Sequence, residues 1–274
     1  MNLTDQDFDD LISLISLCGF QEIMPHFRCL EGDDISAKAN ASDLVTIADV
    51  AAEKFLTKEL RAKFPDAIVF GEESVSEDAN VLKNHKWDGV SFVIDPIDGT
   101  FNFASGAPIF GTMLAIVKNS ETIGAIIHDP VMGDTIYARK GEGGFYRQAD
   151  GKEVRLQVSE PVSFDQATGS ISWTGLPHEM RVKLLSNQAR SLNFFGYRCA
   201  AHDYRILATA RAHFVLYSKM MPWDHLGGTL IHQEAGGHSA RFDGSEYKPQ
   251  TIDGGLIHAP NKDMWDELRY ELWR

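Results

Sequence analysis

The sequence predicts an α+β fold, with helices and a meandering sheet in its first half and strands alternating with helices in its second. Apolar residues recur at helical spacing near the start of the chain. Strand-like runs then follow one another with only turn residues between them, which indicates antiparallel hairpins. After about residue 160, short strands alternate with helical stretches instead. We therefore predict two closely packed halves, 1–160 and 161–274, of which the second adds another layer of sheet and helices.

Two amphipathic helices are predicted first. Thr4 followed by Asp7 resembles a capping box, and apolar residues at helical spacing follow at Phe8, Leu11, Ile12 and Ile15. The second helix carries an apolar ladder made of Ala48, Ala52, Leu56, Leu60 and Phe64, and Pro65 ends it. Asp49 lies early in this helix, away from the centre of the ladder. Its local context favours a solvated acid in a first helical turn.

A strand predicted over 67–70 ends in the acidic pair Glu72 and Glu73, preceded by Gly71. Neighbouring side chains on a strand point to opposite faces, so only one of these acids could face a given site unless the chain turns at Gly71. A solvated acidic loop is the alternative. Further strands are predicted at 112–117, 122–128, 135–138 and 144–147.

The second half is predicted to contain three short strands and four helices. The strands are expected at 169–173, 214–217 and 255–258, and the helices at 178–189, 202–211, 223–235 and 261–273. The third helix begins near Pro222 and Asp224, where a simple N-terminal cap is an adequate local explanation of the aspartate. His225, His232 and His238 lack the spacing and the fourth ligand of a zinc site.

The composition excludes several classes of protein. Hydrophobic residues make up 43% of the 274 residues and charged residues 24%, as in ordinary globular proteins. The net charge of −13 argues against direct binding of nucleic acid, and it would also repel a phosphorylated substrate unless cations are bound. Three cysteines without CxxC spacing favour a reducing, cytoplasmic location. The N-terminus is acidic, and no apolar run is long enough to span a membrane.

The stretch 93–103 carries the clearest chemical signal. Apolar residues lead into Asp95 and Asp98, which are three positions apart, and Gly99 and Thr100 follow directly. This order is typical of a strand that ends at a metal site and turns into a helix. The two carboxylates would flank a cation, and the N–H groups of Gly99 and Thr100 would point at an anion. Alone, the same residues could form a simple turn.

Four motifs occur together in a particular order. Asp49 follows Leu44-Val45-Thr46, Glu72-Glu73 follow Phe70-Gly71, Asp95-Pro96-Ile97-Asp98-Gly99-Thr100 come next, and Trp223-Asp224 precede paired glycines. Together they resemble the inositol monophosphatase family of magnesium-dependent, lithium-sensitive phosphatases. The resemblance covers nearly the whole chain and implies a layered α-β-α-β-α sandwich, as in inositol monophosphatase and fructose-1,6-bisphosphatase. It also suggests a homodimer.

The resemblance implies two to three magnesium ions. Glu72 and Asp95, with the main-chain carbonyl of Ile97, would hold the first ion. Asp95, Asp98 and Asp224 would hold the second, and a weaker third ion would depend mainly on Glu72. Independently of any resemblance, converging carboxylates cannot all stay ionised without cations, and ligands that are all oxygen favour Mg²⁺ over Zn²⁺.

The resemblance also assigns catalytic roles. Asp49 and Thr100 would orient and deprotonate the attacking water, with Glu73 nearby, and the N–H groups of Gly99 and Thr100 would bind the phosphate. The expected reaction is magnesium-dependent hydrolysis of a small phosphate monoester, such as a sugar or polyol phosphate. Two ions would clamp the phosphate and activate a water without a covalent intermediate.

The residues on the substrate side depart from the family pattern. Tyr217 stands where inositol-selective members carry a glutamate, and Arg198-Cys199-Ala200-Ala201 replaces the usual Gly-Ser-Ala-Ala. A different alcohol could therefore fit against Tyr217, Ala200 and Arg198. Fructose 1,6-bisphosphate and histidinol phosphate are alternative substrates.

A second phosphate would need further cations, for which Arg198, Arg205 and Lys219 are candidates; ion-paired surface positions are the alternative. Some bacterial relatives act instead as accessory factors of the transcription machinery, so a protein partner is a further alternative.

Overall fold

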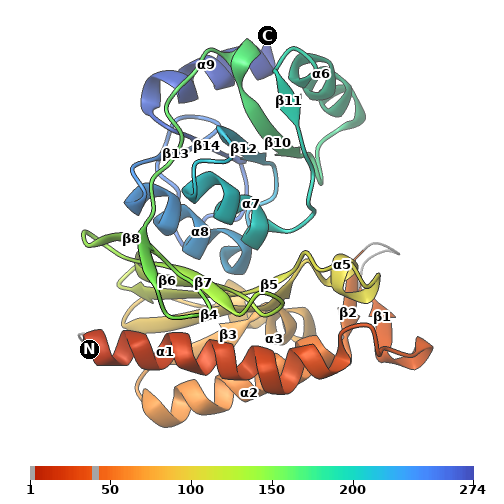
Figure 1. Ribbon diagram of the computed structural model, residues 1–274. Coiled ribbons are helices and arrows are strands. Elements are labelled where there is room, and N and C mark those ends of the chain that lie inside the picture. The colour runs from red at the N-terminus through yellow and green to blue at the C-terminus, as the bar shows by residue number, and fades with distance from the viewer. Residues whose placement is uncertain (1–3, 39–42) are drawn as a thin grey trace.

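The computed structural model describes residues 4–38 and 43–274 and consists of alternating layers of helix and sheet. Two helices cover the outer face of a seven-stranded sheet, two more lie between this sheet and a five-stranded one, and another two cover the far side (Figure 1). The layered α+β sandwich expected from the sequence is confirmed. Within the described residues, every helix is too short or too polar to span a bilayer.

The seven-stranded sheet is an antiparallel meander with one parallel pair at its edge. Its strands occur in chain order as β3 (Ile68–Gly71), β4 (Val90–Asp98), β5 (Gly111–Lys118), β6 (Glu121–Asp129), β7 (Asp134–Arg139), β8 (Gly143–Arg147) and β9 (Glu153–Arg155). The predicted hairpins connect β5 through β8. By contrast, β3 runs parallel to β4, because helices rather than a tight turn join these two strands.

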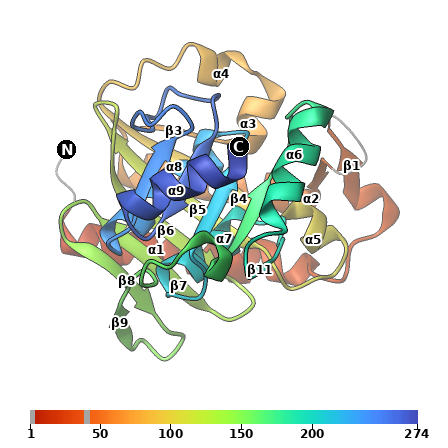
Figure 2. The same cartoon turned by 90° about the horizontal axis from the view of Figure 1, so that it is seen from above.

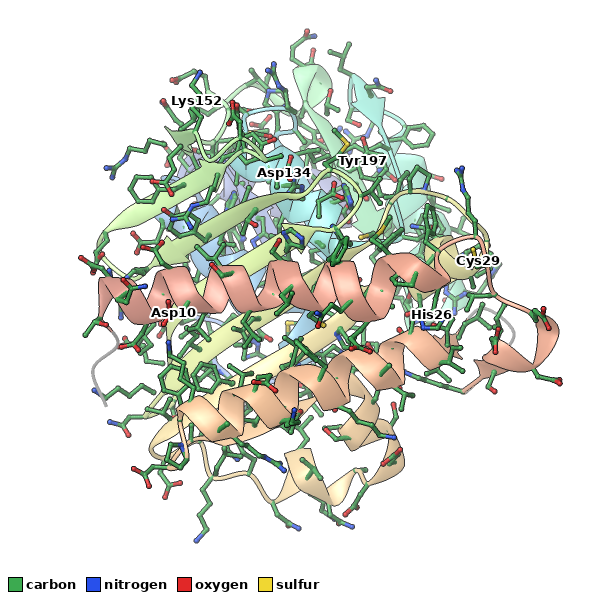
Figure 3. The ribbon with its side chains drawn as sticks, turned by 60° about the horizontal axis from the view of Figure 1, so that its bottom comes forward. Asp10, His26, Cys29, Asp134, Lys152 and Tyr197 are labelled. Carbon is green, nitrogen blue, oxygen red and sulfur yellow. The ribbon has the colours of Figure 1, made fainter. Side chains whose placement is uncertain are left out.

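Helices α1 (Asp5–Cys18) and α2 (Ile47–Lys63) cover the outer face of this sheet. They lie side by side across the strands (Figure 3). The predicted capping box of Thr4 and Asp7 is present at the start of α1. The apolar faces of both helices pack on alternate residues of β4, including Phe92 and Ile94, whereas Val93 points to the opposite face.

The five-stranded sheet has the order β11-β10-β12-β14-β13. Its strands are β10 (Thr168–Ser172), β11 (Asn193–Phe194), β12 (Phe214–Tyr217), β13 (His238–Arg241) and β14 (Leu256–Ala259). The short β11 and the polar β13 were not predicted. Helices α6 (His178–Gln188) and α9 (Lys262–Trp273) cover its outer face, as the view from above shows (Figure 2).

Helices α7 (Ala200–Ala208) and α8 (Pro222–Glu234) form the middle layer. Helix α8 is buried over nearly its whole length, because it contacts the seven-stranded sheet on one side and the second sheet on the other. The other short strands and α-helices are β1 (Ile35–Ala37), β2 (Leu44–Thr46), α3 (Glu72–Glu77), α4 (Asn80–Lys83) and α5 (Thr100–Ala104). A π-helical turn at Gly19–Ile23 and three 3-10 helices at Met24–His26, Gly32–Asp34 and Phe164–Gln166 complete the described elements.

Candidate metal and phosphate site

The site is built where β4 ends. This strand includes the whole Asp95-Pro96-Ile97-Asp98 segment, and its pairing with β5 is interrupted between Asp95 and Asp98. Gly99 then turns the chain with a φ of +90°, and α5 starts at Thr100. A side chain at Gly99 would also lie 2.9 Å from the Ile109 carbonyl oxygen, so glycine is required both for the turn and for space.

Three carboxylates from distant parts of the chain gather at this strand end. Glu72, Asp95 and Asp224 each offer an oxygen within 4.8 Å of the others. Asp95 is 1% exposed, and its Oδ1 has no hydrogen-bond partner among the described residues. A buried oxygen of this kind is unfavourable unless it binds a cation or a donor. The donor set therefore fits a hard metal ion.

The electrostatics of the cluster support the same interpretation. Burial raises the pKa of Asp95 and Asp224 well above the usual range, and the neighbouring charges of Glu72 and Asp98 raise both further. Burial also raises the pKa of Asp98 to about 6. The acids therefore repel one another when ionised, and a bound cation would relieve this repulsion.

Asp98 adopts a different orientation from the other acids. Its Oδ2 accepts a hydrogen bond from the backbone N–H of Ala201 at the start of α7, and the Cys199 thiol lies 3.1 Å from the same oxygen. Asp98 still lines the small cavity that contains Glu72, Asp95 and Asp224, although it is outside their close cluster. Helix α7 thus fixes the orientation of Asp98.

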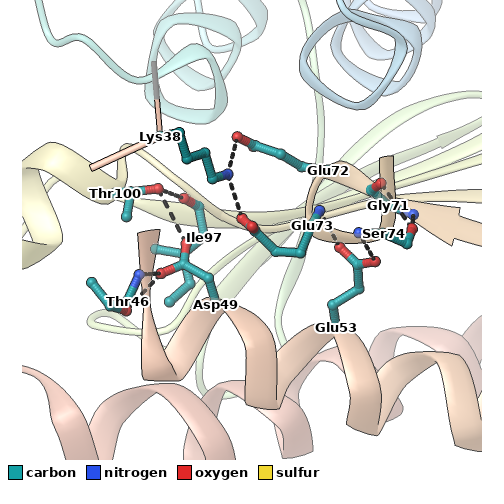
Figure 4. A network of polar contacts seen from close by, with 10 residues as sticks. All are labelled: Lys38, Thr46, Asp49, Glu53, Gly71, Glu72, Glu73, Ser74, Ile97 and Thr100. Atoms are coloured by element: carbon teal, nitrogen blue, oxygen red, sulfur yellow. Dashed lines mark hydrogen bonds and ion pairs between the residues drawn. The ribbon is translucent and has the colours of Figure 1, made fainter. Parts of the chain in front are cut away.

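Lys38 is a participant that the sequence did not reveal. Its Nζ lies 2.8 Å from Glu72 Oε1 and 2.7 Å from Glu73 Oε1, and Figure 4 shows the ammonium group between the two glutamates. Burial disfavours its charge, but the two glutamates outweigh this effect and raise the pKa of Lys38. Burial raises the pKa of Glu73 to about 7. A lone lysine in a polar stretch carried no signal of this contact.

Asp49 and Thr100 are brought together as expected. Thr100 Oγ1 lies 3.1 Å from Asp49 Oδ1 and 3.0 Å from the Ile97 carbonyl oxygen. The other oxygen of Asp49 accepts from the N–H and hydroxyl of Thr46 in a capping box. The local interpretation of Asp49 as a solvated acid is wrong, since it is 1% exposed, and burial raises its pKa to about 6.

Glu72 and Glu73 do not form a solvated loop, because the chain turns into helix α3 directly at Glu72. Both side chains consequently reach Lys38. The turn is held by Glu53 of α2, whose carboxylate accepts from the N–H groups of Glu73 at 2.7 Å and Ser74 at 2.9 Å (Figure 4). Glu53 was not predicted, because its partners are two backbone groups twenty residues away.

A second cavity of about 440 Å³ adjoins the acid cluster, and Asp98, Arg198 and Asp224 line both. Ala200, Tyr217 and Lys219 also line it. The Tyr217 hydroxyl donates to the buried Asp203 at 3.1 Å, while the other Asp203 oxygen has no partner within the described part of the chain. Asp203 is thus a polar pocket group that no motif indicated.

The candidate cations for a second phosphate separate into two groups. Arg198 lies at the junction of the two cavities, in a left-handed conformation with φ of 53°, and its guanidinium stacks 3.8 Å from the centre of the Phe101 ring. Lys219 lies in the same cavity. Arg205, in contrast, forms an ion pair with Asp134 and lines a different pocket, so the alternative of an ion-paired position holds for Arg205.

Asp224 lies in the first turn of α8, but it is not the N-cap, which is Met221. The simple capping explanation of Asp224 is therefore wrong. Acids carried by β4, α3 and α8 line one small cavity with a second cavity beside it, and in a layered sandwich this arrangement defines a class of site that can hold a metal ion next to a small molecule.

Comparisons with known proteins assign the chain within this class. Residues 14–274 match the family model described as "Inositol monophosphatase family", and the chain belongs to that family, whose members are phosphoric monoester hydrolases. It is 32% identical to the "Fructose-1,6-bisphosphatase/inositol-1-monophosphatase" of Thermotoga maritima, over 88% of this chain and 89% of that protein. It is also 32% identical to the "Nus factor SuhB" of Haemophilus influenzae, over 85% of each. Among solved structures, a Thermotoga maritima IMPase superposes with a TM-score of 0.82 at 28% identity, covering 97% of this chain and 96% of that one.

Proposed function

We propose that the protein hydrolyses a small phosphate monoester, such as a sugar or polyol phosphate, and that it does so with Mg²⁺ bound at the acid cluster. The observation that carries this proposal is the cluster of Glu72, Asp95 and Asp224, in which Asp95 is buried and one of its oxygens lacks a partner within the described ranges. Buried acids of this kind are stable in ionised form only beside a cation. The family membership supports the reaction type.

Five residues would hold two to three ions. Glu72, Asp95 and the carbonyl of Ile97 would form one site, and Asp95, Asp98 and Asp224 the next. When bound, magnesium supplies charge neutralisation and lowers the pKa of a bound water. The protein's own contribution is to converge oxygens at fixed positions from β4, α3 and α8.

Asp49 and Thr100 would accept the proton of the attacking water. The attacking water gives its proton to Thr100 Oγ1 while the hydroxyl proton passes to Asp49 Oδ1, 3.1 Å away. A pKa raised by burial to about 6 suits Asp49 to this role near neutral pH. Glu73 would act from nearby through its contact with Lys38.

Gly99 and Thr100 would bind phosphate oxygens through their N–H groups at the start of α5. Helix α5 has five residues, so these N–H groups rather than a helix dipole would stabilise the developing charge. The alcohol would occupy the adjoining cavity against Ala200, Tyr217 and Arg198.

A bisphosphate is the second candidate substrate. Arg198 and Lys219 have no carboxylate within ion-pair distance among the residues the structure describes, although the chain carries a net charge of −13. Two such cations in one cavity would suit a further anionic group. The name of the Thermotoga maritima relative includes a bisphosphatase activity, which supports this candidate.

Phosphate release tests the proposal. Purified protein is incubated with inositol 1-phosphate, fructose 1,6-bisphosphate and histidinol phosphate, with Mg²⁺ or with a chelator. Turnover of at least one ester that requires Mg²⁺ supports the proposal. Absence of any turnover, together with capture of a defined transcription factor, would favour an accessory role instead, as the name of the Haemophilus influenzae relative suggests. A sedimentation measurement would test the homodimer proposed from the family resemblance.

A further inference from the structure

A chain of buried polar side chains connects the helices that carry the acids. The Tyr204 hydroxyl, on α7, lies 3.1 Å from His225 Nδ1 on α8 and 3.0 Å from His258 Nε2 on β14. His258 Nδ1 lies 2.8 Å from Ser239 Oγ, which lies 2.9 Å from His232 Nδ1. Tyr204 and His258 are fully buried. Buried polar groups in such a connected chain fix one another's positions.

One backbone carbonyl determines which group donates in each hydrogen bond of this row of side chains. His225 Nε2 lies 3.0 Å from the backbone carbonyl oxygen of Lys219, which can only accept, so this nitrogen carries the proton. In neutral His225 the Nδ1 is then an acceptor, and Tyr204 donates to it. Tyr204 in turn accepts from His258 Nε2, and His258 Nδ1 accepts from Ser239. Burial lowers the pKa of His258 well below its usual range, so the imidazole of His258 is neutral, with one nitrogen that donates and one that accepts.

The aromatic ring of Tyr204 also packs closely against α8. A side chain added at Gly228 would lie 1.9 Å from the Tyr204 ring, so the glycine lets the ring lie directly against the helix. Tyr204 therefore joins α7 and α8 both by packing and by hydrogen bonding. Its hydroxyl further links α8 to β14 through His258.

Both helices begin at the acid cluster. The start of α7 holds Asp98 through the Ala201 N–H, and the first turn of α8 carries Asp224. His225 follows Asp224 directly, and its hydrogen bond to the Lys219 carbonyl joins the segment before α8 to the first turn of this helix. The separation of Asp98 from Asp224 thus depends on how α7 and α8 are held together.

We propose that Tyr204 is a positioning residue for the metal-binding acids, and that its hydroxyl fixes the separation of Asp98 and Asp224 by joining α7 to His225 and His258. This inference rests on the proposed metal site. Among the contacts of the described residues, no hydrogen bond or ion pair joins Tyr204 to Asp98 or Asp224; it acts through the two helices and the Lys219 segment. Its hydroxyl should therefore influence metal affinity more than a purely structural group would.

Tyr204→Phe removes the hydroxyl and keeps the ring. We expect Mg²⁺ binding to weaken by about tenfold or more, as for other residues that orient metal ligands. The dissociation constant is measured by titration calorimetry of Mg²⁺ into metal-free protein without substrate. Tyr137→Phe is the matched control, because Tyr137 is also buried and its hydroxyl also makes a hydrogen bond, to Glu153 rather than to a residue of α8 or β14. It should bind Mg²⁺ like the wild type.

Ser239→Ala separates positioning from stability. It breaks the two buried hydrogen bonds that Ser239 makes with His232 and His258. The contacts from Tyr204 to His225 and from His225 to Lys219 stay in place. We expect a lower melting temperature with unchanged Mg²⁺ affinity. If Tyr204→Phe does not fold, His225→Asn replaces it, because its shorter side chain should lose the Lys219 contact and weaken Mg²⁺ binding.

Mg²⁺ affinity of Tyr204→Phe within twofold of the wild type would overturn the inference, even if its melting temperature falls. Failure of the wild type to bind Mg²⁺ at all would instead refute the proposed metal site. Failure to release phosphate, with the difference in Mg²⁺ affinity retained, would refute the proposed reaction and leave the positioning role supported.

Discussion

At the scale of single residues, Asp95 combines several features that disfavour its charge. It is buried, one of its oxygens lacks a described partner, and burial together with the charges of Glu72, Asp98 and Asp224 raises its pKa. Every one of these features makes the ionised form unfavourable without a cation. The buried and mutually repelling acids should therefore lower the stability of the folded protein when no metal is bound.

Asp95→Asn and Asp224→Asn test this destabilisation. Each removes a charge that repels its neighbours, so we expect metal-free protein to melt at the same temperature as the wild type or a few degrees higher. Activity with Mg²⁺ should fall by about 10²- to 10³-fold, because a ligand is lost. Thermal melting in chelator and phosphate release measure the two effects. A large fall in melting temperature for both variants would count against a cation site.

Thr100→Ala tests the proposed proton path. The substitution removes the hydroxyl that contacts Asp49 and the Ile97 carbonyl, and it keeps the backbone N–H that would bind phosphate. We expect kcat to fall by about 10²-fold or more with KM changed by less than about threefold. Steady-state kinetics check this split. Unchanged kcat would remove Thr100 from the path.

Residues that form the site differ in how far the sequence revealed them. Asp95, Asp98 and Gly99 occur in one short segment with a recognisable order, so their neighbourhood was predictable. Lys38 and Glu53 were not, because each contacts acids or backbone groups distant in sequence and belongs to no motif. Local patterns also misled at Asp49, where helix periodicity described the apolar ladder but not the burial of an acid beside Thr100.

At the scale of elements, the start of α3 determines whether Glu72 can join the cluster. Glu53 of α2 accepts from two N–H groups in the first turn of α3 and so orients the helix that begins at Glu72. A carboxylate has two acceptor oxygens for this purpose, whereas an amide has one and presents a donor to the second N–H. The orientation of α3 should therefore be sensitive to this one side chain.

Glu53→Gln tests that dependence. We expect a loss of about 1–3 kcal/mol in the free energy of unfolding, because a buried N–H loses its charged partner, and a severalfold weaker Mg²⁺ affinity. Chemical denaturation and calorimetry measure these changes. Glu59→Gln on the same helix is the control, since Glu59 is partly exposed and contacts only Lys58 among the pairs described. Equal behaviour of the two variants would contradict the orienting role of Glu53.

Elements with strong periodicity or hairpin spacing were predicted well, including α1, α2 and the β5–β8 meander. The parallel pairing of β3 with β4 and the short β11 and β13 were missed. Strand order is set by contacts between segments far apart in sequence, and two- to four-residue strands carry too little pattern to be recognised.

At the scale of the whole molecule, β4 of the seven-stranded sheet carries Asp95 and Asp98, and α8, which packs between the two sheets, carries Asp224. The acids also couple the stability of the whole protein to pH. Their folded pKa values are raised above the unfolded values, so the folded state binds more protons, and stability falls as pH rises. Buried histidines such as His225 and His232, whose pKa burial lowers to about 3, act in the opposite direction.

Comparison with a variant isolates the contribution of the acids. The difference in melting temperature between Asp95→Asn and the metal-free wild type should grow in favour of the variant between pH 5 and 8, as groups with pKa values of about 6 to 7 ionise. The histidines are common to both proteins and cancel. Saturating Mg²⁺ should stabilise the wild type more at pH 8 than at pH 5. A difference that does not vary with pH would show that Asp95 is not part of a mutually repelling cluster.

The central claim is that acids from β4, α3 and α8 form one site for divalent cations. Crystals grown with Mn²⁺ in place of Mg²⁺ test it most directly, because Mn²⁺ can be located by its anomalous scattering. We expect at least one peak within coordination distance of oxygens of Glu72, Asp95 and Asp224. Anomalous maps without a peak at these carboxylates, from crystals in which Mn²⁺ supports phosphate release, would contradict it.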